Sequence, residues 1–188
     1  MPLNFTVELA AGQLLTLSEG YYRGEAKNGP PHGTGILSYA NQQEYEGQFV
    51  DGLPHGAGIY RWLPEGEEAS GRFDGGEVVG KFSVVWADNG SYVGSIRLRP
   101  PSDEGLLPHG RGRRIYTSGS EYDGLWRLGQ RHGEGVLVTT QGERYEGEWY
   151  VDLRHGQGTY SWSNGNSYDG AWNNDQPDGQ GLFHLGER

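Results

Sequence analysis

Three histidines have the type and spacing that could do chemistry in this chain: His109, His132 and His155 recur every 23 residues. Imidazoles at regular intervals could hold a row of metal ions. If each 23-residue segment is a pair of strands, however, equivalent histidines lie roughly 10 Å apart, because neighbouring strands are about 4.8 Å apart. Zinc needs each ligand within about 2.1 Å. We therefore expect no metal site, and expect each histidine to fix its own turn or to pack on a neighbouring ring.

Acidic residues near these histidines could act as general acids or bases. The candidates are Asp123, Glu134, Glu146 and Glu148. They occupy solvent-type positions of a repeating pattern, and nothing marks one copy as special. The Gly-x-Gly pairs are not phosphate-binding loops, because no helix follows to offer its N-terminus. We expect no catalytic residues, no cofactor and no enzymatic activity.

One short motif occurs three times at a period of 23 residues, and the histidines and acidic residues above, apart from His109, lie within it. Each copy is Tyr-x-Gly-x-Trp, followed by His-Gly-x-Gly or a close variant whose first glycine comes nine residues after the glycine of Tyr-x-Gly-x-Trp. The copies are Tyr122 to Trp126 with His132 to Gly135, Tyr145 to Trp149 with His155 to Gly158, and Tyr168 to Trp172 with Asp178 to Gly181. A fixed period of this length is typical of a solenoid or array.

The motif predicts two strands joined by a short turn. Tyr122, Gly124 and Trp126 share one parity, and Gly133 and Gly135 share a parity in the following segment. Alternation with period two indicates strands. Glycine at fixed strand positions suggests that a ring presses on the backbone, and we expect the aromatic residue of the adjacent unit there. The predicted fold is all-β: an elongated, solenoid-like ribbon of stacked antiparallel hairpins.

The same pattern extends over most of the chain. Residues 1–21 are expected to form a degenerate N-terminal capping hairpin, and residues 22–188 seven repeats. The third repeat is degenerate: Ala69 replaces the tyrosine, and Val79 to Phe82 replace His-Gly-x-Gly. The fourth carries an inserted loop at about 97–108, where adjacent prolines cannot continue a strand ladder. Asp152 and Asp175 stand in place of turn glycines.

Composition agrees with a thin array and narrows the function classes. The chain has 34 glycines, 12% aromatic residues, no cysteine and a net charge of −10. The lack of cysteine excludes disulfides and thiolate sites. No apolar run approaches the roughly 20 residues of a membrane span. We expect an intracellular protein.

With these residues in hand, the sequence resembles the MORN repeat (membrane occupation and recognition nexus) over roughly residues 22–184. The resemblance implies a hairpin ribbon with an aromatic groove, and three roles: a scaffold in cilia or the cytoskeleton, an adaptor attached to an enzyme, or a lipid-head-group binder. A chain made only of repeats is most similar to radial-spoke-head and other axonemal or basal-body components.

The aromatic rows are the main candidate binding site. One of the two positions in each repeat is expected to form the core, and the other to be partly exposed in a groove that suits an amphipathic helix of a partner. Core packing of both rows is the equal alternative. The candidate partner-binding residues are Tyr22, Tyr45, Phe49, Tyr122, Trp126, Tyr145, Trp149, Tyr168 and Trp172.

A basic island interrupts the acidic chain. Residues 97–131 hold seven arginines against four acids, a net charge of +3 between two acidic flanks. The arginines are Arg97, Arg99, Arg111, Arg113, Arg114, Arg127 and Arg131. They could touch tubulin, an acidic helix or lipid phosphate, or could simply be solvated arginines stacked on aromatic rings. The acidic flanks argue against nucleic acid and against docking on an anionic membrane.

These observations lead to one functional expectation and two alternatives. We expect a non-enzymatic scaffold in the ciliary or flagellar axoneme or the associated cytoskeleton, which binds amphipathic helices or axonemal subunits along its aromatic face. A homodimer through the sheet ends is a further expected arrangement. The alternatives are a peripheral phosphoinositide-binding adaptor that uses the basic island, and a targeting arm for an enzyme on another chain.

Overall fold

The computed structural model describes residues 15–17, 20–40, 42–63, 66–97 and 106–186. The chain divides into two compact units, each described here by itself. The N-terminal unit comprises residues 1–87 with 98–106, and the C-terminal unit comprises residues 88–97 with 107–188. The expected inserted loop lies largely outside the described residues, as do Arg99 and most of the expected capping hairpin.

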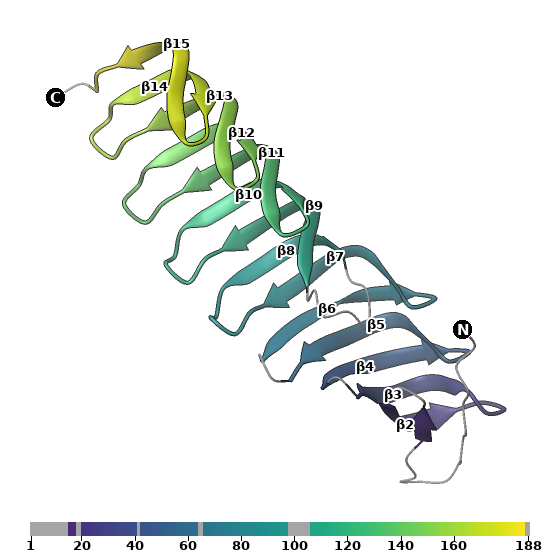
Figure 1. The fold of residues 1–188 in the computed structure, drawn as a ribbon. Coiled ribbons are helices and arrows are strands. Elements are labelled where there is room, and N and C mark those ends of the chain that lie inside the picture. Colours follow the sequence, from purple (N-terminus) through teal and green to yellow (C-terminus); the bar gives the residue numbers. More distant parts are fainter. Residues whose placement is uncertain (1–14, 18–19, 41, 64–65, 98–105, 187–188) are drawn as a thin grey trace. The chain divides into compact units, whose positions relative to one another are not determined.

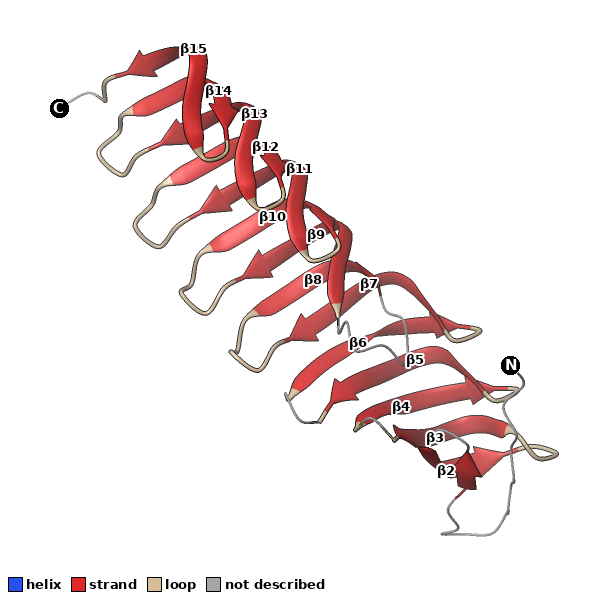
Figure 2. Ribbon diagram, viewed as in Figure 1, coloured by secondary structure: helices blue, strands red, loops and turns tan. Residues whose placement is uncertain are grey.

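All elements of the described residues are β-strands (Figure 1, Figure 2). The N-terminal unit contains β1 (Leu15–Leu17), β2 (Gly20–Ala26), β3 (Pro31–Tyr39), β4 (Gln43–Val50), β5 (Leu53–Trp62), β6 (Glu67–Asp74) and β7 (Glu77–Val85). The C-terminal unit contains β8 (Ser91–Arg97), β9 (Leu107–Ile115), β10 (Glu121–Arg127), β11 (Gln130–Val138), β12 (Arg144–Tyr150), β13 (Leu153–Ser161), β14 (Ser167–Asn173) and β15 (Gln176–His184). Within each unit every strand pairs antiparallel with the next one in sequence. The predicted all-β fold of stacked antiparallel hairpins is confirmed.

The second glycine of each His-Gly-x-Gly motif lies beneath a tyrosine ring of its own hairpin. In β12 and β13, Gly147 is paired with Gly158, and the ring of Tyr145 covers both. A Cβ atom on Gly158 would lie 2.6 Å from Cζ of Tyr145. The expectation that the covering ring comes from the adjacent unit is therefore wrong. The tyrosine sits two residues before the first glycine of its own strand, so its side chain reaches back over the glycine pair.

The first glycine of His-Gly-x-Gly has a different role from the second, because it allows a β-bulge. Between β10 and β11 the register shifts after Gly124, so that one residue of β10 stands opposite three residues of β11. Gly133 lies in this bulge with φ of 67°, a left-handed conformation that glycine adopts at no steric cost. The bulge re-aligns the strand, so that Trp126 pairs with Arg131 at the hairpin end.

Five hairpins close with two-residue turns in which both residues have positive φ, the geometry of a type I′ turn. Asn, Asp and Gly tolerate this conformation, and Asn174 occupies the first position of the last turn with φ of 48°. Val151 occupies the same position of the β12–β13 turn with φ of 50°. A β-branched side chain is strained in this region.

We predict that Val151→Asn raises the free energy of unfolding by about 1 kcal/mol, because it relieves this strain. The reciprocal change Asn174→Val in the β14–β15 turn is the matched control and should lower it by a similar amount. Urea denaturation of both variants measures the effect. Equal and opposite shifts are expected, whereas a destabilising Val151→Asn would show that Val151 contributes more by packing than it costs in strain.

The hairpin of β6 and β7, which the sequence predicts to be a degenerate third repeat, keeps its core by exchanging a large and a small residue between its two strands. Ala69 on β6 replaces the tyrosine, and Phe82 on β7 stands where other repeats have glycine. The Phe82 ring is fully buried and covers Gly71, whose Cβ position lies 2.7 Å from the ring. The ring that is missing on the first strand is thus supplied by the second.

Candidate functional site

The predicted partner-binding aromatics form the core of each unit. Tyr122 is 0% and Trp149 4% exposed, and the same burial holds for Tyr22, Tyr45, Phe49, Trp126, Tyr145 and Trp172. Only Tyr168, in β14, is half-buried. Of the two alternatives left open by the sequence, the partly exposed row is wrong and core packing of both rows is observed. The glycine backbone covers one side of each ring and neighbouring rings cover the other. The partner-binding role of these residues stays a prediction.

The rings form a ladder of edge-to-face contacts within each unit. Trp149 contacts Tyr145 of its own hairpin at 5.0 Å between centroids and Tyr122 of the preceding hairpin at 5.4 Å, both near perpendicular. Its indole Nε1 donates to the carbonyl of Gly135 at 3.1 Å. Trp126 and Trp172 donate to Gly112 and Gly158 in the same way. Tyrosine thus organises one hairpin and tryptophan joins consecutive hairpins.

The tyrosine hydroxyls tie the ladder to the strand backbone. Tyr45 donates to the carbonyl of Gln48 at 3.0 Å, and Tyr145 to that of Glu148 at 2.9 Å. Desolvation raises the pKa of Tyr22 and of Tyr45 to about 12. The hydroxyls therefore keep their protons at neutral pH and act as structural donors.

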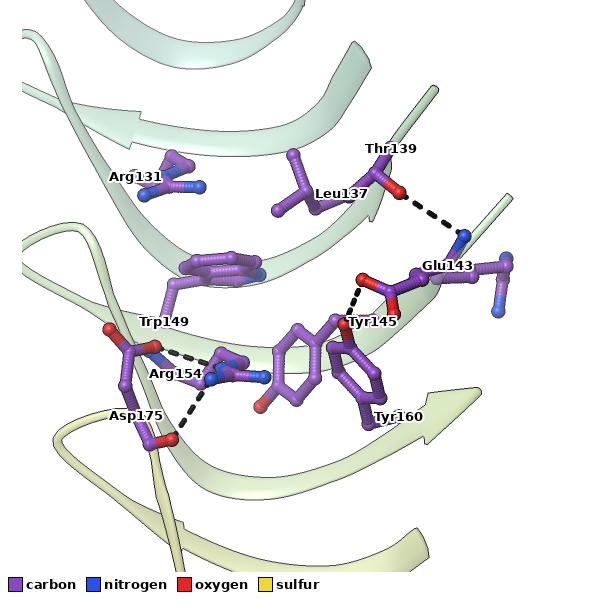
Figure 3. A pocket seen from close by; sticks show the side chains of 10 residues that line it. Arg131, Leu137, Thr139, Glu143, Tyr145, Trp149, Arg154, Tyr160 and Asp175 are labelled. Carbon is purple, nitrogen blue, oxygen red and sulfur yellow. Dashed lines mark hydrogen bonds and ion pairs between the residues drawn. The ribbon is translucent and has the colours of Figure 1, made fainter. Parts of the chain in front are cut away.

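Two arginines cover the ladder in the C-terminal unit. Arg131 lies over the Trp149 ring at 4.2 Å and Arg154 over the Trp172 ring at 4.5 Å, both in cation–π geometry. Together with Leu137, Tyr160 and other side chains they line an open cavity of about 260 Å³ (Figure 3). Across this cavity the Tyr160 hydroxyl donates to Glu143 at 2.6 Å. The accessible surface above the aromatic core is therefore mixed, with cationic, aromatic and acidic groups.

An aspartate of the following turn holds each of these arginines. Arg154 donates its backbone N–H and its Nε–H to Oδ1 of Asp175 at 3.0 and 2.9 Å, and Nη2 donates to the Asp175 carbonyl at 2.9 Å. Asp175 returns a bond from its own N–H to the Arg154 carbonyl at 3.1 Å. Arg131 and Asp152 repeat this arrangement.

Other repeats build the same junction from proline and glycine. Gly52, Gly76 and Gly129 donate their N–H to the carbonyls of Pro31, Pro54 and Pro108 at 2.8 to 2.9 Å. Proline has no N–H to satisfy, so glycine suffices; arginine has one, and the aspartate carboxylate accepts it. Sequence reasoning treated Asp152 and Asp175 as departures and missed Arg154. The signal was present, because aspartate replaces the turn glycine only where arginine replaces the preceding proline.

This pairing predicts strong coupling between the two positions. Asp175→Gly should destabilise the protein because it leaves the Arg154 N–H without its carboxylate acceptor. Arg154→Pro should also destabilise it, because Asp175 then keeps its left-handed backbone conformation without the hydrogen bonds from Arg154. The double variant recreates the Pro54–Gly76 junction and should be more stable than the sum of the single effects by at least about 1 kcal/mol. Urea denaturation of the four proteins measures the coupling. Additive effects would refute the assigned pairing.

His132 and His155 pack on a neighbouring ring, as expected, whereas His32 and His55 lie near an aspartate of the next hairpin rather than of their own turn. Nδ1 of His55 lies 3.3 Å from Asp74 of the next hairpin turn, and His32 lies near Asp51 in the same way. His132 and His155 both pack on the Tyr150 ring, at 5.3 and 5.8 Å. Across the residues that the structure describes, no group of three or more His, Asp or Glu side chains is placed to hold a metal ion.

The acidic residues considered for catalysis lie on the sheet face opposite the aromatic core and are exposed. Glu146 accepts a hydrogen bond from Arg144 at 2.6 Å, and Glu148 accepts one from the N–H of Gln157 at 2.9 Å. Asp123 lies 3.9 Å from Arg111. These contacts are made within the sheet and support the strands.

The arginines of the basic island do not form one patch. By strand parity Arg97, Arg111, Arg113 and Arg127 lie on the outer face, whereas Arg114 and Arg131 lie on the aromatic face. Arg113 forms an ion pair with Glu121, and Arg114 lies over the Tyr116 ring at 4.8 Å. Sequence proximity suggested a cluster, but alternation along the strands divides it between two faces. No helix of the described residues is long and apolar enough to span a membrane.

Comparison with known families and structures gives one specific match. The MORN repeat model matches six segments, which together cover more than half of the chain: residues 22–44, 45–62, 107–121, 122–144, 145–167 and 168–186. The degenerate third repeat lies outside these segments. No curated protein sequence matches the chain.

The chain also shows partial similarity to solved structures. The TCP domain of SAS-4 (dCPAP) from Drosophila melanogaster, in complex with a proline-rich motif of Ana2 (dSTIL), is 10% identical, with 97% of this chain and 90% of that chain covered and a TM-score of 0.45. The TCP10 domain of Danio rerio CPAP, in complex with a STIL peptide, is 14% identical over 74% of each chain, with a TM-score of 0.26. These scores are too low to carry any inference about function.

Proposed function

Because this chain belongs to the MORN-repeat family, we propose that it is a non-enzymatic scaffold that binds a segment of a partner protein over its aromatic face. The observation that carries the proposal is the surface above the buried ladder in the C-terminal unit. It combines exposed parts of Leu137 and Tyr160 with the stacked arginines around one open cavity. Such a mixture of apolar surface and a few oriented polar groups suits an amphipathic helix.

We further propose that the partner belongs to the axoneme of a cilium or flagellum, or to the associated cytoskeleton. This part rests on the resemblance of these repeats to those of radial-spoke-head components. The division of the arginines between two faces argues against a phosphoinositide-binding surface, since attraction to an anionic membrane requires a cationic patch on one side.

Extraction of ciliated cells tests the cytoskeletal role. Cells are treated with detergent and the insoluble fraction is then washed with stepwise increasing salt, with the protein followed by immunoblot. A cytoskeletal scaffold should remain insoluble in detergent and leave only at high salt. Release by detergent alone would contradict the cytoskeletal role and would favour a membrane or freely diffusing adaptor.

A further inference from the structure

Arg131 and Arg154 carry hydrogen-bond donors that their own aspartates do not use. In each arginine, Nε and Nη2 donate hydrogen bonds to the aspartate of the next turn. Across the described residues, Nη1 of neither arginine has a hydrogen-bond partner within the chain. Both side chains line the same cavity, where they are 19% and 23% exposed. Figure 3 shows the two guanidinium groups along one side of this cavity, with Thr139 and Glu143 on the other.

The fold does not require arginine at these two positions. Pro31, Pro54 and Pro108 occupy the equivalent place in other repeats, and each accepts the same backbone bond from the following turn. A half-buried cation loses part of its hydration, whereas proline does not. Two consecutive repeats thus carry a charged group where an uncharged one completes the same junction, which points to a role in binding.

From this we infer that Arg131 and Arg154 form a carboxylate-binding pair for an acidic helix of the partner protein. The inference rests on the proposed function and names the chemistry of the partner at that site. Guanidinium groups with spare N–H donors match carboxylate oxygens. Of the two carboxylates that line the cavity, Asp175 is held by Arg154 and Glu143 accepts the Tyr160 hydroxyl, so the Nη1 donors of the two arginines remain in surplus there.

The spacing of the two arginines selects the geometry of the partner. They are one repeat apart, which is two strand spacings or roughly 10 Å. On an α-helix, residues i and i+7 lie on one face about 10.5 Å apart. A helix that lies across the strands would therefore present two Glu or Asp side chains seven residues apart to the arginines. An adjacent apolar stripe of the same helix would face Leu137 and Tyr160, which lie further along the same two strands, β11 and β13. The recessed position of the guanidinium groups favours a projecting side chain over the flat surface of a membrane.

A matched pair of synthetic peptides tests the inference on the full chain. Both are fluorescein-labelled, end-capped amphipathic helices with leucines on one face; one carries two Glu residues seven apart and the other carries Gln at the same places. Binding is measured by fluorescence anisotropy at low salt. We expect the Glu peptide to bind at least tenfold more tightly than the Gln peptide.

The chain itself supplies the control variant. Changing Arg131→Pro with Asp152→Gly, and Arg154→Pro with Asp175→Gly, restores the junction of the other repeats and removes both guanidinium groups. Arg131→Gln with Arg154→Gln is a second variant that keeps both backbone donors. Each should bind the Glu peptide at least tenfold more weakly and the Gln peptide unchanged, with an unaltered circular dichroism spectrum.

The outcomes separate this inference from the proposed function. Equal binding of both peptides by the native chain would overturn the assignment of the two arginines to carboxylate binding. The proposed function, a face that binds a helix, would still hold. Failure of both peptides at millimolar concentrations would overturn both. Binding of phosphatidylserine vesicles in preference to the Glu peptide, if lost in the two variants, would also overturn the inference, because it would assign the arginines to lipid.

Discussion

Replacing Trp149 with alanine is expected to lower the free energy of unfolding of the C-terminal unit by about 3–5 kcal/mol. The Trp149 ring contacts Tyr122, Tyr145 and Arg131, and its Nε1 donates across to Gly135 of the preceding hairpin. The change therefore removes both buried area and the link between hairpins. Since such an array has a thin core, no other side chain can move in to fill the space.

Tyr150→Ala is the matched control, because Tyr150 is the next residue of β12 but points to the opposite face and is 54% exposed. Its loss should cost no more than about 1 kcal/mol. Urea denaturation, with amide hydrogen exchange of β11 to β13, measures both effects. A Trp149→Ala loss as small as that of Tyr150→Ala would show that the ladder does not hold the hairpins together.

Exchanging the large and small residues of a regular repeat should give the second large effect. Tyr145→Ala leaves a cavity, at a cost of about 3–5 kcal/mol. Gly158→Phe drives a ring into the space that Tyr145 fills and should be at least as damaging, because the Cβ alone would lie 2.6 Å from the tyrosine ring. The double variant reproduces the Ala69 and Phe82 arrangement of β6 and β7, where one ring still covers the glycine.

We therefore expect the double variant to be more stable than the sum of the single effects by at least about 2 kcal/mol, a coupling typical of residues that share one site. The cycle is measured by urea denaturation of the four proteins. If the effects of Tyr145→Ala and Gly158→Phe simply add, Phe82 does not substitute for the missing tyrosine in the third repeat.

The architecture could be predicted because the repeat shows both of its periods directly. Alternation across Tyr122, Gly124 and Trp126 predicts a strand, and the 23-residue spacing predicts stacked hairpins. Which ring covers the glycines could not be predicted in this way. Parity places Tyr145 and Gly158 on the same face, but only the observed register shows that the tyrosine of the same hairpin lies over them.

The candidate site was harder to predict, because exposure depends on how neighbouring side chains pack. Sequence alone placed the tyrosine and tryptophan rows on one face but could not show that both are buried. The prediction that the basic island forms one cluster was wrong because adjacent residues of a strand, such as Arg113 and Arg114, point to opposite faces. Arg154 was missed because its role appears only when the turn residue of the next hairpin, Asp175, is considered with it.

Site-resolved photo-crosslinking in cells tests the central claim, that a partner binds over the aromatic face. A photoreactive phenylalanine analogue replaces Leu137 or Tyr160, which line the cavity, or Val138 or Thr159, their neighbours on the opposite face. The account predicts a discrete crosslinked polypeptide from the first two positions and none from the second two. Crosslinks only from Val138 and Thr159, or from none of the four positions, would contradict it.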